Sequence, residues 1–119
     1  MFKKGIILLI IFLFLIVIGC KKASPPVLIE IGPTKTKVGV PFNIQPNNEA
    51  AMWFKTENAT ENTKIIFNGI EIRTDYKNSK LLTAPIPKEF YSKPGKYEIY
   101  LIDKKTNLKS NSLFFTVEE

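Results

Sequence analysis

The segment that most limits the fold is TKIIFNGIEIRT, residues 63–74. Its central Asn68-Gly69 pair accepts the positive φ angles of a two-residue type I′ turn between antiparallel strands. Directly across this turn, Phe67 faces Ile70 and Ile65 faces Ile72, so these four apolar side chains share one side of the ribbon. The opposite side carries Lys64, Ile66, Glu71 and Arg73. The segment therefore predicts a β-hairpin with one face for a core and the other mostly for water.

Other short alternating runs, separated by turn residues, occupy the chain from residue 27 onward. The further strand candidates are Val27–Ile31, Thr36–Val38, Phe42–Gln45, Ala51–Phe54, Lys80–Ala84, Lys96–Asp103 and Ser110–Val117. After residue 26 we identify no helix and no convincing internal repeat. Short strands at close intervals are typical of an all-β sandwich or barrel, and we expect about seven or eight of them.

The two C-terminal strand candidates show clear alternation. One face receives Tyr97, Ile99 and Leu101 from the first run, and Leu113, Phe115 and Val117 share a face of the second. Pro94-Gly95 precedes the first run and predicts a type II turn, because proline fixes φ and the glycine accepts the positive φ that follows. These runs predict a second strand pair at the end of the domain.

Several pieces of this region, taken in order, resemble one known family. They are IEIGPTKTKVGVPFNI, IIFNGIEI, LLTAPIPKEF, KPGKYEIYLID and SNSLFFTV. In IPT/TIG domains, an Ile-x-Pro opening and a glycine precede the second strand, a central strand ends at a glycine turn, a proline follows a short strand, and Pro-Gly-x-Tyr begins the penultimate strand. The corresponding positions here are Ile31 with Pro33, Gly39, Gly69, Pro85 or Pro87, and Pro94-Gly95-Lys96-Tyr97. The segment QPNNEAAMWF, residues 45–54, lacks the Gly-x-x-Phe element that the family usually carries.

This resemblance implies an immunoglobulin-like β-sandwich of IPT/TIG type over residues 27–119. It also implies a binding or spacer role, because domains of this family mostly serve as such units. Tyr97 would act as a tyrosine corner, in which the hydroxyl bonds to nearby backbone.

The N-terminal segment has a different composition. Lys3, Lys4 and Gly5 precede thirteen apolar residues that run from Ile6 to Ile18. A basic stretch followed by such an apolar stretch is typical of a secretory signal peptide. The alternative is a permanent transmembrane helix, which needs about 20 apolar residues. The length of the run therefore favours a signal.

The end of this apolar run together with the next two residues, Val17-Ile18-Gly19-Cys20, resembles the lipobox of bacterial lipoproteins. The resemblance implies that the Cys20 thiol takes a diacylglycerol thioether and that cleavage after Gly19 frees an amine for a third acyl chain. Each buried CH₂ group contributes about 0.8 kcal/mol, so two or three chains anchor a protein far more firmly than one. The alternative is an uncleaved signal anchor with an incidental cysteine.

We therefore expect three parts: a helical signal peptide at residues 1–19, the lipidated Cys20 with a polar, proline-rich tether to residue 26, and the sandwich from residue 27. Loss of Lys3 and Lys4 lowers the formal charge from +6 to +4. Because Cys20 is the single cysteine and carries the anchor, the fold relies on its core rather than on disulfides. The expected location is the cell envelope, and in a Gram-negative cell Lys21 after the cysteine favours the outer membrane.

The composition argues against most catalytic chemistry. The chain has no histidine, and the anchor uses the single thiol, so the usual general base, a cysteine nucleophile and a Cys/His zinc site are all absent. No Gly-rich phosphate loop and no cluster of calcium-binding oxygens is visible. A carboxylate-only enzyme is the remaining catalytic alternative. Lysines dispersed among glutamates also indicate no nucleic-acid partner. We therefore expect no enzyme activity, no cofactor and no metal.

The segment Met52-Trp53-Phe54 contains the single tryptophan and is a candidate for a binding surface. In an extended strand Trp53 points opposite to its two neighbours, so one side reaches the core and the other shows apolar surface. Two interpretations stay open: Trp53 is a core residue of the sandwich, or it is exposed and contacts a protein or a sugar ring. The candidate binding surface comprises Met52, Trp53, Phe54, Tyr76, Phe90 and Tyr91.

Together these features predict a lipid-anchored cell-envelope protein whose immunoglobulin-like module is not an enzyme and binds a protein or a surface glycan. The alternative is a structural accessory subunit of a larger envelope assembly, whose exposed strand edge pairs with a neighbour. The membrane is the expected partner through the lipid anchor.

Overall fold

The computed structural model describes residues 23–119, which form an all-β domain. The predicted signal helix, the lipobox, Cys20 and Lys21-Lys22 lie outside the described residues. The strands are β1 (Val27–Gly32), β2 (Lys35–Lys37), β3 (Ala50–Glu57), β4 (Thr63–Phe67), β5 (Ile70–Ile72), β6 (Asp75–Asn78), β7 (Leu81–Ile86), β8 (Gly95–Asp103) and β9 (Leu113–Glu118). A short 3-10 helix, η1 (Lys88–Tyr91), connects β7 to β8. Within residues 23–119, no helix is long and apolar enough to cross a membrane.

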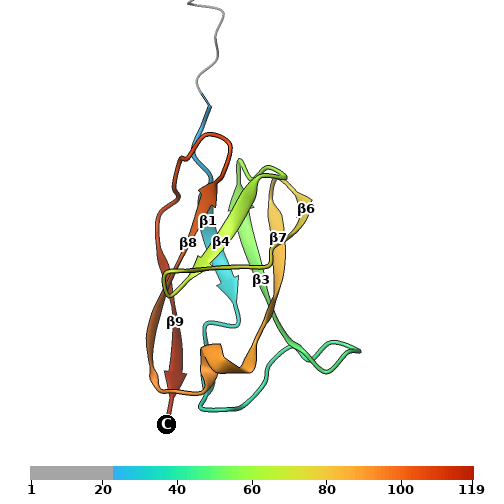
Figure 1. The fold of residues 1–119 in the computed structure, drawn as a ribbon, viewed down its shortest axis with the longest axis vertical. Helices are drawn as coiled ribbons and strands as arrows, with labels where there is room; N and C mark the ends of the chain where they lie inside the picture. The colour runs from blue at the N-terminus through green and yellow to red at the C-terminus, as the bar shows by residue number, and fades with distance from the viewer. Residues whose placement is uncertain (1–22) are drawn as a thin grey trace, which may run out of the picture.

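The strands form two sheets that pack face to face as a β-sandwich (Figure 1). One sheet has four strands in the order β1-β3-β7-β6, and the other has five in the order β2-β9-β8-β4-β5. Neighbouring strands are antiparallel except for β2, which pairs in parallel with β9. The described part of the chain therefore enters the four-stranded sheet first and crosses to the edge of the other sheet between β1 and β2.

The hairpin at the Asn68-Gly69 turn is confirmed. Both turn residues have positive φ angles, and the register pairs Phe67 with Ile70 and Ile65 with Ile72. Two side chains differ from the prediction. Ile70 is 55% exposed because β5 is an edge strand and Ile70 directly follows the turn, whereas Ile66 on the outer face is only 8% exposed. Ile66 lies on β4, between β5 and β8, where its register partners Glu71 and Tyr100 flank it.

The predicted alternation in the C-terminal strands is confirmed. In β8, Ile99 and Leu101 are buried, and in β9 Phe115 and Val117 are buried. Tyr97 packs against the core, and its hydroxyl donates a hydrogen bond of 2.6 Å to the carbonyl oxygen of Lys93, as expected for a tyrosine tied to nearby backbone.

Two local predictions are wrong, and one strand was missed. Residues 42–45 form no strand but part of the loop before β3, where Asn43 has a positive φ angle of 44° and leaves the extended conformation. Gly95 does not have a positive φ angle and opens β8 directly, so Pro94-Gly95 forms no type II turn. The strand β6 was not predicted, because its sequence DYKN shows no apolar alternation.

The core lies between the two sheets and contains aromatic and aliphatic side chains from both. Its largest fully buried members are Phe54, Phe67, Phe115, Leu28, Met52, Ile65, Leu82, Ile99, Leu101 and Val117. Phe42 closes one end of this core by contacting Tyr91 and Phe115, with ring centroids 5.2 and 5.3 Å apart. Pro26, which we had assigned to the tether, is also buried.

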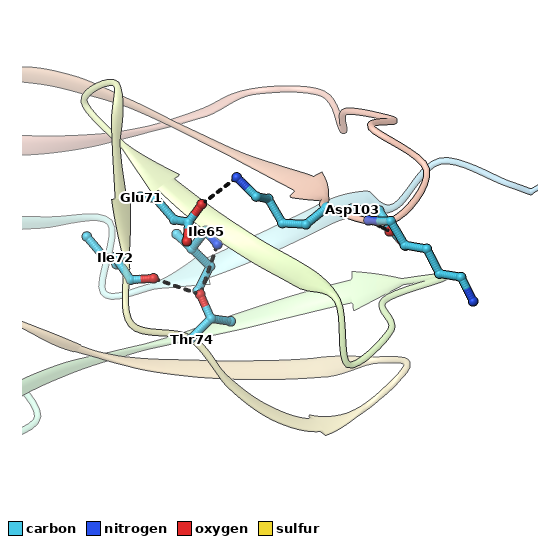
Figure 2. Close-up of polar contacts among 7 residues, drawn as sticks. Ile65, Glu71, Ile72, Thr74 and Asp103 are labelled. Atoms are coloured by element: carbon cyan, nitrogen blue, oxygen red, sulfur yellow. Dashed lines mark hydrogen bonds and ion pairs between the residues drawn. The ribbon is translucent and has the colours of Figure 1, made fainter.

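Polar side chains connect the strands at the sheet edges and at the end where the chain enters the sandwich (Figure 2). The Thr74 hydroxyl accepts from the Ile65 amide at 2.9 Å and donates to the Ile72 carbonyl at 3.1 Å, so it continues the β4–β5 ladder. Asn111 bonds in both directions with the backbone of Leu28, each at 2.9 Å, and so ties edge strand β1 to the segment before β9.

Candidate functional site

An open groove of about 790 Å³ lies on the outer face of the four-stranded sheet. Its floor comes from β3, β7 and β6, and its wall comes from the loop before β3. The residues that line it are Asn43, Ile44, Gln45, Pro46, Asn47, Glu49, Ala51, Met52, Trp53, Arg73, Asp75, Lys77, Thr83, Ala84 and Pro85. We call this feature the Trp53 groove.

One register row crosses all four strands at the floor of the Trp53 groove. Gly32 pairs with Trp53, Trp53 with Thr83, and Thr83 with Asp75. Because side chains alternate along a strand, all members of this row point to the outer face. Trp53 is 36% exposed, and its neighbours Met52 and Phe54 are buried. Trp53 is therefore a surface residue, and the interpretation that placed it in the core is wrong.

The indole of Trp53 lies against the backbone of Gly32. A Cβ atom added at Gly32 would lie 2.1 Å from Cε2 and Cζ2 of the indole and 2.5 Å from Nε1. Such distances are far below van der Waals contact, so a side chain at this position and the present indole position exclude each other. Because Gly32 has no side chain, the indole occupies the space above its backbone.

The wall of the Trp53 groove is tied to the sheet by hydrogen bonds. The Asn43 amide nitrogen donates to the carbonyl oxygens of Ala51 at 3.2 Å and Gly32 at 3.5 Å. Within the loop, the Gln45 side chain donates to the Asn43 carbonyl at 2.7 Å, and the Gln45 amide donates to the Glu49 carbonyl at 2.9 Å. These bonds connect the wall to β1 and β3, the strands that carry Gly32 and Trp53.

The charged groups of the Trp53 groove balance each other. Arg73 and Asp75 form an ion pair at 3.4 Å, and both side chains are accessible to solvent. Lys77 and Glu49 supply one further charge of each sign to the lining. The groove therefore combines an apolar floor with donors and acceptors and carries no excess charge.

The other predicted site residues present no exposed side chain to the Trp53 groove. Met52, Phe54 and Tyr91 have buried side chains and are not available as binding surface, because they fill the space between the sheets. Phe90 is half-buried against Phe67, with ring centroids 5.1 Å apart. Tyr76 is exposed on edge strand β6, but it shares a register row with buried Leu82 and does not line the groove.

Of the predicted surface residues, Trp53 alone has an exposed side chain that lines the Trp53 groove. The sequence prediction missed the polar members of the lining, which come from residues 43–49, 73–77 and 83. The mostly polar segment from Asn43 to Glu49, directly before β3, could have indicated these residues. Arg73 and Asp75 carried no such signal, because they reach the groove only through the pairing of β6 with β7.

The buried carboxylate of Asp103 lies outside the Trp53 groove, and its hydrogen bonds indicate a structural role. It accepts hydrogen bonds from the Lys105 amide at 2.9 Å, the Thr106 amide at 3.2 Å and the Thr60 hydroxyl at 3.0 Å. Burial acts to raise the pKa of Asp103, but the amide and hydroxyl donors outweigh it and hold this pKa below its usual value. Asp103 thus fixes the turn after β8. Within residues 23–119, no group of three or more acidic residues is arranged to hold a metal ion.

Comparison with known proteins gives no family assignment: no family model matches the chain, and no curated protein matches it significantly.

Proposed function

We propose that this chain is a lipid-anchored cell-envelope protein whose sandwich is a non-enzymatic binding module. The Trp53 groove holds its ligand, which is an envelope protein or a surface glycan. The observation that carries this proposal is the exposed indole of Trp53, resting on Gly32 in a groove whose wall is hydrogen-bonded in place. Ligand sites are typically concave, with an apolar surface and a few placed polar groups, and this groove has that composition.

The order of the strands supports an immunoglobulin-like sandwich. In the immunoglobulin fold, strands A, B, E and D form one sheet and C, F and G the other. The four-stranded sheet has the matching order β1-β3-β7-β6, and β9-β8-β4 corresponds to G, F and C. The sequence resemblance to IPT/TIG domains points to the same assignment.

The lipid anchor is supported by the basic and apolar N-terminal segment and by the lipobox that ends at Cys20. The tether enters the sandwich at the start of β1, and Gly32, which supports Trp53, is the last residue of that strand. In Figure 1 the tether and the loop before β3 lie at different ends of the sandwich. A chain anchored through Cys20 would therefore present the Trp53 groove away from the membrane.

The anchor is tested by labelling cells with a traceable fatty acid. The wild-type protein takes up label and remains in the membrane fraction, whereas a Cys20→Ser variant does neither. Label on the Cys20→Ser variant would contradict the proposed anchor.

The binding role is tested by crosslinking in intact cells, followed by mass spectrometry. We expect wild-type protein to retain an envelope ligand and a Trp53→Ala variant to lose it. A variant at Phe114, an exposed aromatic residue on the other sheet, serves as the matched control. Equal retention by Trp53→Ala would contradict a role for the groove.

The alternative function, a structural accessory subunit, has one specific observation in its favour. Ile70 is 55% exposed on β5, an edge strand that leaves one side free for pairing. A stoichiometric protein complex that survives Trp53→Ala and is lost when Ile70 is replaced by lysine would support this alternative.

A further inference from the structure

The Trp53 groove has features that distinguish between the two ligand classes left open above. The indole contacts the backbone of Gly32, and Trp53 is 36% exposed. An aromatic face carries partial negative charge, so it attracts the weakly positive C–H groups on the face of a sugar ring. A partly exposed tryptophan in an open groove therefore offers a platform for a pyranose.

The wall and the far side of the Trp53 groove place polar groups around the indole. The lining places the amides of Asn43, Gln45 and Asn47 on the wall and the charged groups of Arg73 and Asp75 at the far side. Amides, guanidinium and carboxylate together supply donors and acceptors. Sugar hydroxyl groups both donate and accept, so they match such a lining, whereas the centre of a protein interface is depleted of charged groups.

The polar groups are held before any ligand arrives. Asn43 and Gln45 each use an amide nitrogen to bind the backbone, and their side-chain oxygens take no part in those bonds. The Arg73–Asp75 ion pair restrains the opposite rim. A groove with fixed hydrogen-bonding groups loses less conformational entropy when it binds.

The balance of charge in the Trp53 groove further restricts the class of ligand that it can bind. Arg73 and Lys77 are matched by Asp75 and Glu49, so the groove has no excess positive charge for a phosphate- or uronate-rich polymer. Its volume of about 790 Å³ also lies in the range of small-ligand sites, about 300–1,000 Å³.

From these observations we infer that the Trp53 groove binds a short stretch of uncharged glycan, built of hexoses or N-acetylhexosamines. The inference rests on the proposed binding function and names its ligand class. One sugar ring stacks on the exposed indole of Trp53, and its hydroxyl groups bond to the amides of the wall and to the Arg73–Asp75 pair.

The single tryptophan makes this inference directly measurable, because all indole fluorescence comes from the groove. The full-length protein is solubilised in a detergent without a sugar headgroup and applied to an array of uncharged and acidic oligosaccharides. The oligosaccharides that bind are then titrated against tryptophan fluorescence. We expect uncharged oligosaccharides to bind and to change the emission, with no preference for acidic ones.

Three variants locate the binding. Trp53→Ala and Thr83→Arg should each weaken binding by at least about tenfold, which is a detectable loss of about 1.4 kcal/mol. Because Trp53→Ala contains no tryptophan, its binding is measured by calorimetry, and wild type is measured in the same way. Thr83→Arg keeps the indole and fills the floor with a long side chain, so it remains informative if Trp53→Ala fails to fold. Phe114→Ala, at an aromatic residue 47% exposed on the other sheet, should bind like wild type.

The outcomes separate this inference from the proposed function. If no uncharged glycan binds but a protein is crosslinked through a Trp53-dependent contact, the glycan inference is wrong and the binding function stands. Preference for acidic glycans, or unchanged glycan binding by both groove variants, also overturns the inference. If neither glycan nor protein depends on Trp53, both the inference and the proposed function fail.

Discussion

The position of the Trp53 indole depends on Gly32, a neighbour in the sheet that has no side chain. The register row Gly32-Trp53-Thr83 places the ring on the outer face, and Gly32 leaves space for it because it has no side chain. This dependence on a glycine resembles an aromatic residue covering a glycine on a neighbouring strand, which stabilises a sheet by packing over exposed backbone.

Replacing Gly32 by alanine should move the indole off the sheet, because the new Cβ would lie 2.1 Å from two ring atoms. We expect a red shift of tryptophan emission, a loss of ligand retention and a change in unfolding free energy of about 1 kcal/mol, the usual size for a single substitution. Emission spectra and urea denaturation check this. Phe114→Ala is the control that should leave emission unchanged, and an unshifted spectrum for Gly32→Ala would refute the packing described.

Asp103 makes the unfolding free energy of the domain dependent on pH in the acidic range. Its pKa is lowered in the folded protein, so the unfolded chain binds a proton more readily. The stabilisation is therefore complete above the unfolded value of about 3.9 and is lost as the pH falls through the lower folded value. We expect Asp103→Asn to lose about 1–3 kcal/mol at pH 7, because an amide is a poorer match for three donors.

Urea denaturation of wild type and Asp103→Asn at pH 7 and at pH 2 measures this contribution. The two free energies of unfolding should approach each other at the lower pH, because the wild-type carboxylate takes up a proton as the pH falls through its lowered pKa. A constant difference between the two proteins across this range would contradict the assignment.

At the scale of the element, the strands that the sequence predicted correctly carry their own local signals. The β4–β5 hairpin has Asn68 and Gly69 in the positive φ region, and β8 and β9 alternate over their buried residues. The strand β6 and the loop at residues 42–45 depend on tertiary contacts. The first is held by pairing with β7, and the second is set by the bonds of Asn43 to Gly32 and Ala51.

The end of the β4–β5 ladder depends on the hydroxyl of Thr74 (Figure 2). Thr74→Val has nearly the same shape but leaves the Ile65 amide and the Ile72 carbonyl without this partner. We expect a loss of about 1–3 kcal/mol in unfolding free energy, the cost of an unsatisfied buried polar group. Thr116→Val, a half-buried substitution on β9, is the matched control and should cost less. Equal effects in the two proteins would argue against the bridge.

At the scale of the whole molecule, the alternation of apolar and polar residues along the strands predicts the sandwich, but it does not predict the Trp53 groove. The apolar faces predicted from sequence fill the core, with Ile70 as an exception at the sheet edge. The Trp53 groove is assembled from residues 43–53, 73–77 and 83–85, which are brought together by the order β3-β7-β6 in one sheet. No local pattern encodes that order, so the sequence identified Trp53 but not its polar neighbours.

The central claim is that Trp53 serves binding rather than the core. Its most direct test measures unfolding free energy and envelope-ligand retention together for Trp53→Ala and Phe114→Ala. We predict that Trp53→Ala abolishes retention while costing no more than about 2 kcal/mol, below the 3–5 kcal/mol typical of a buried tryptophan. Phe114→Ala should keep full retention. A loss of stability in the core range, with ligand still retained by the folded Trp53→Ala protein, would contradict the claim.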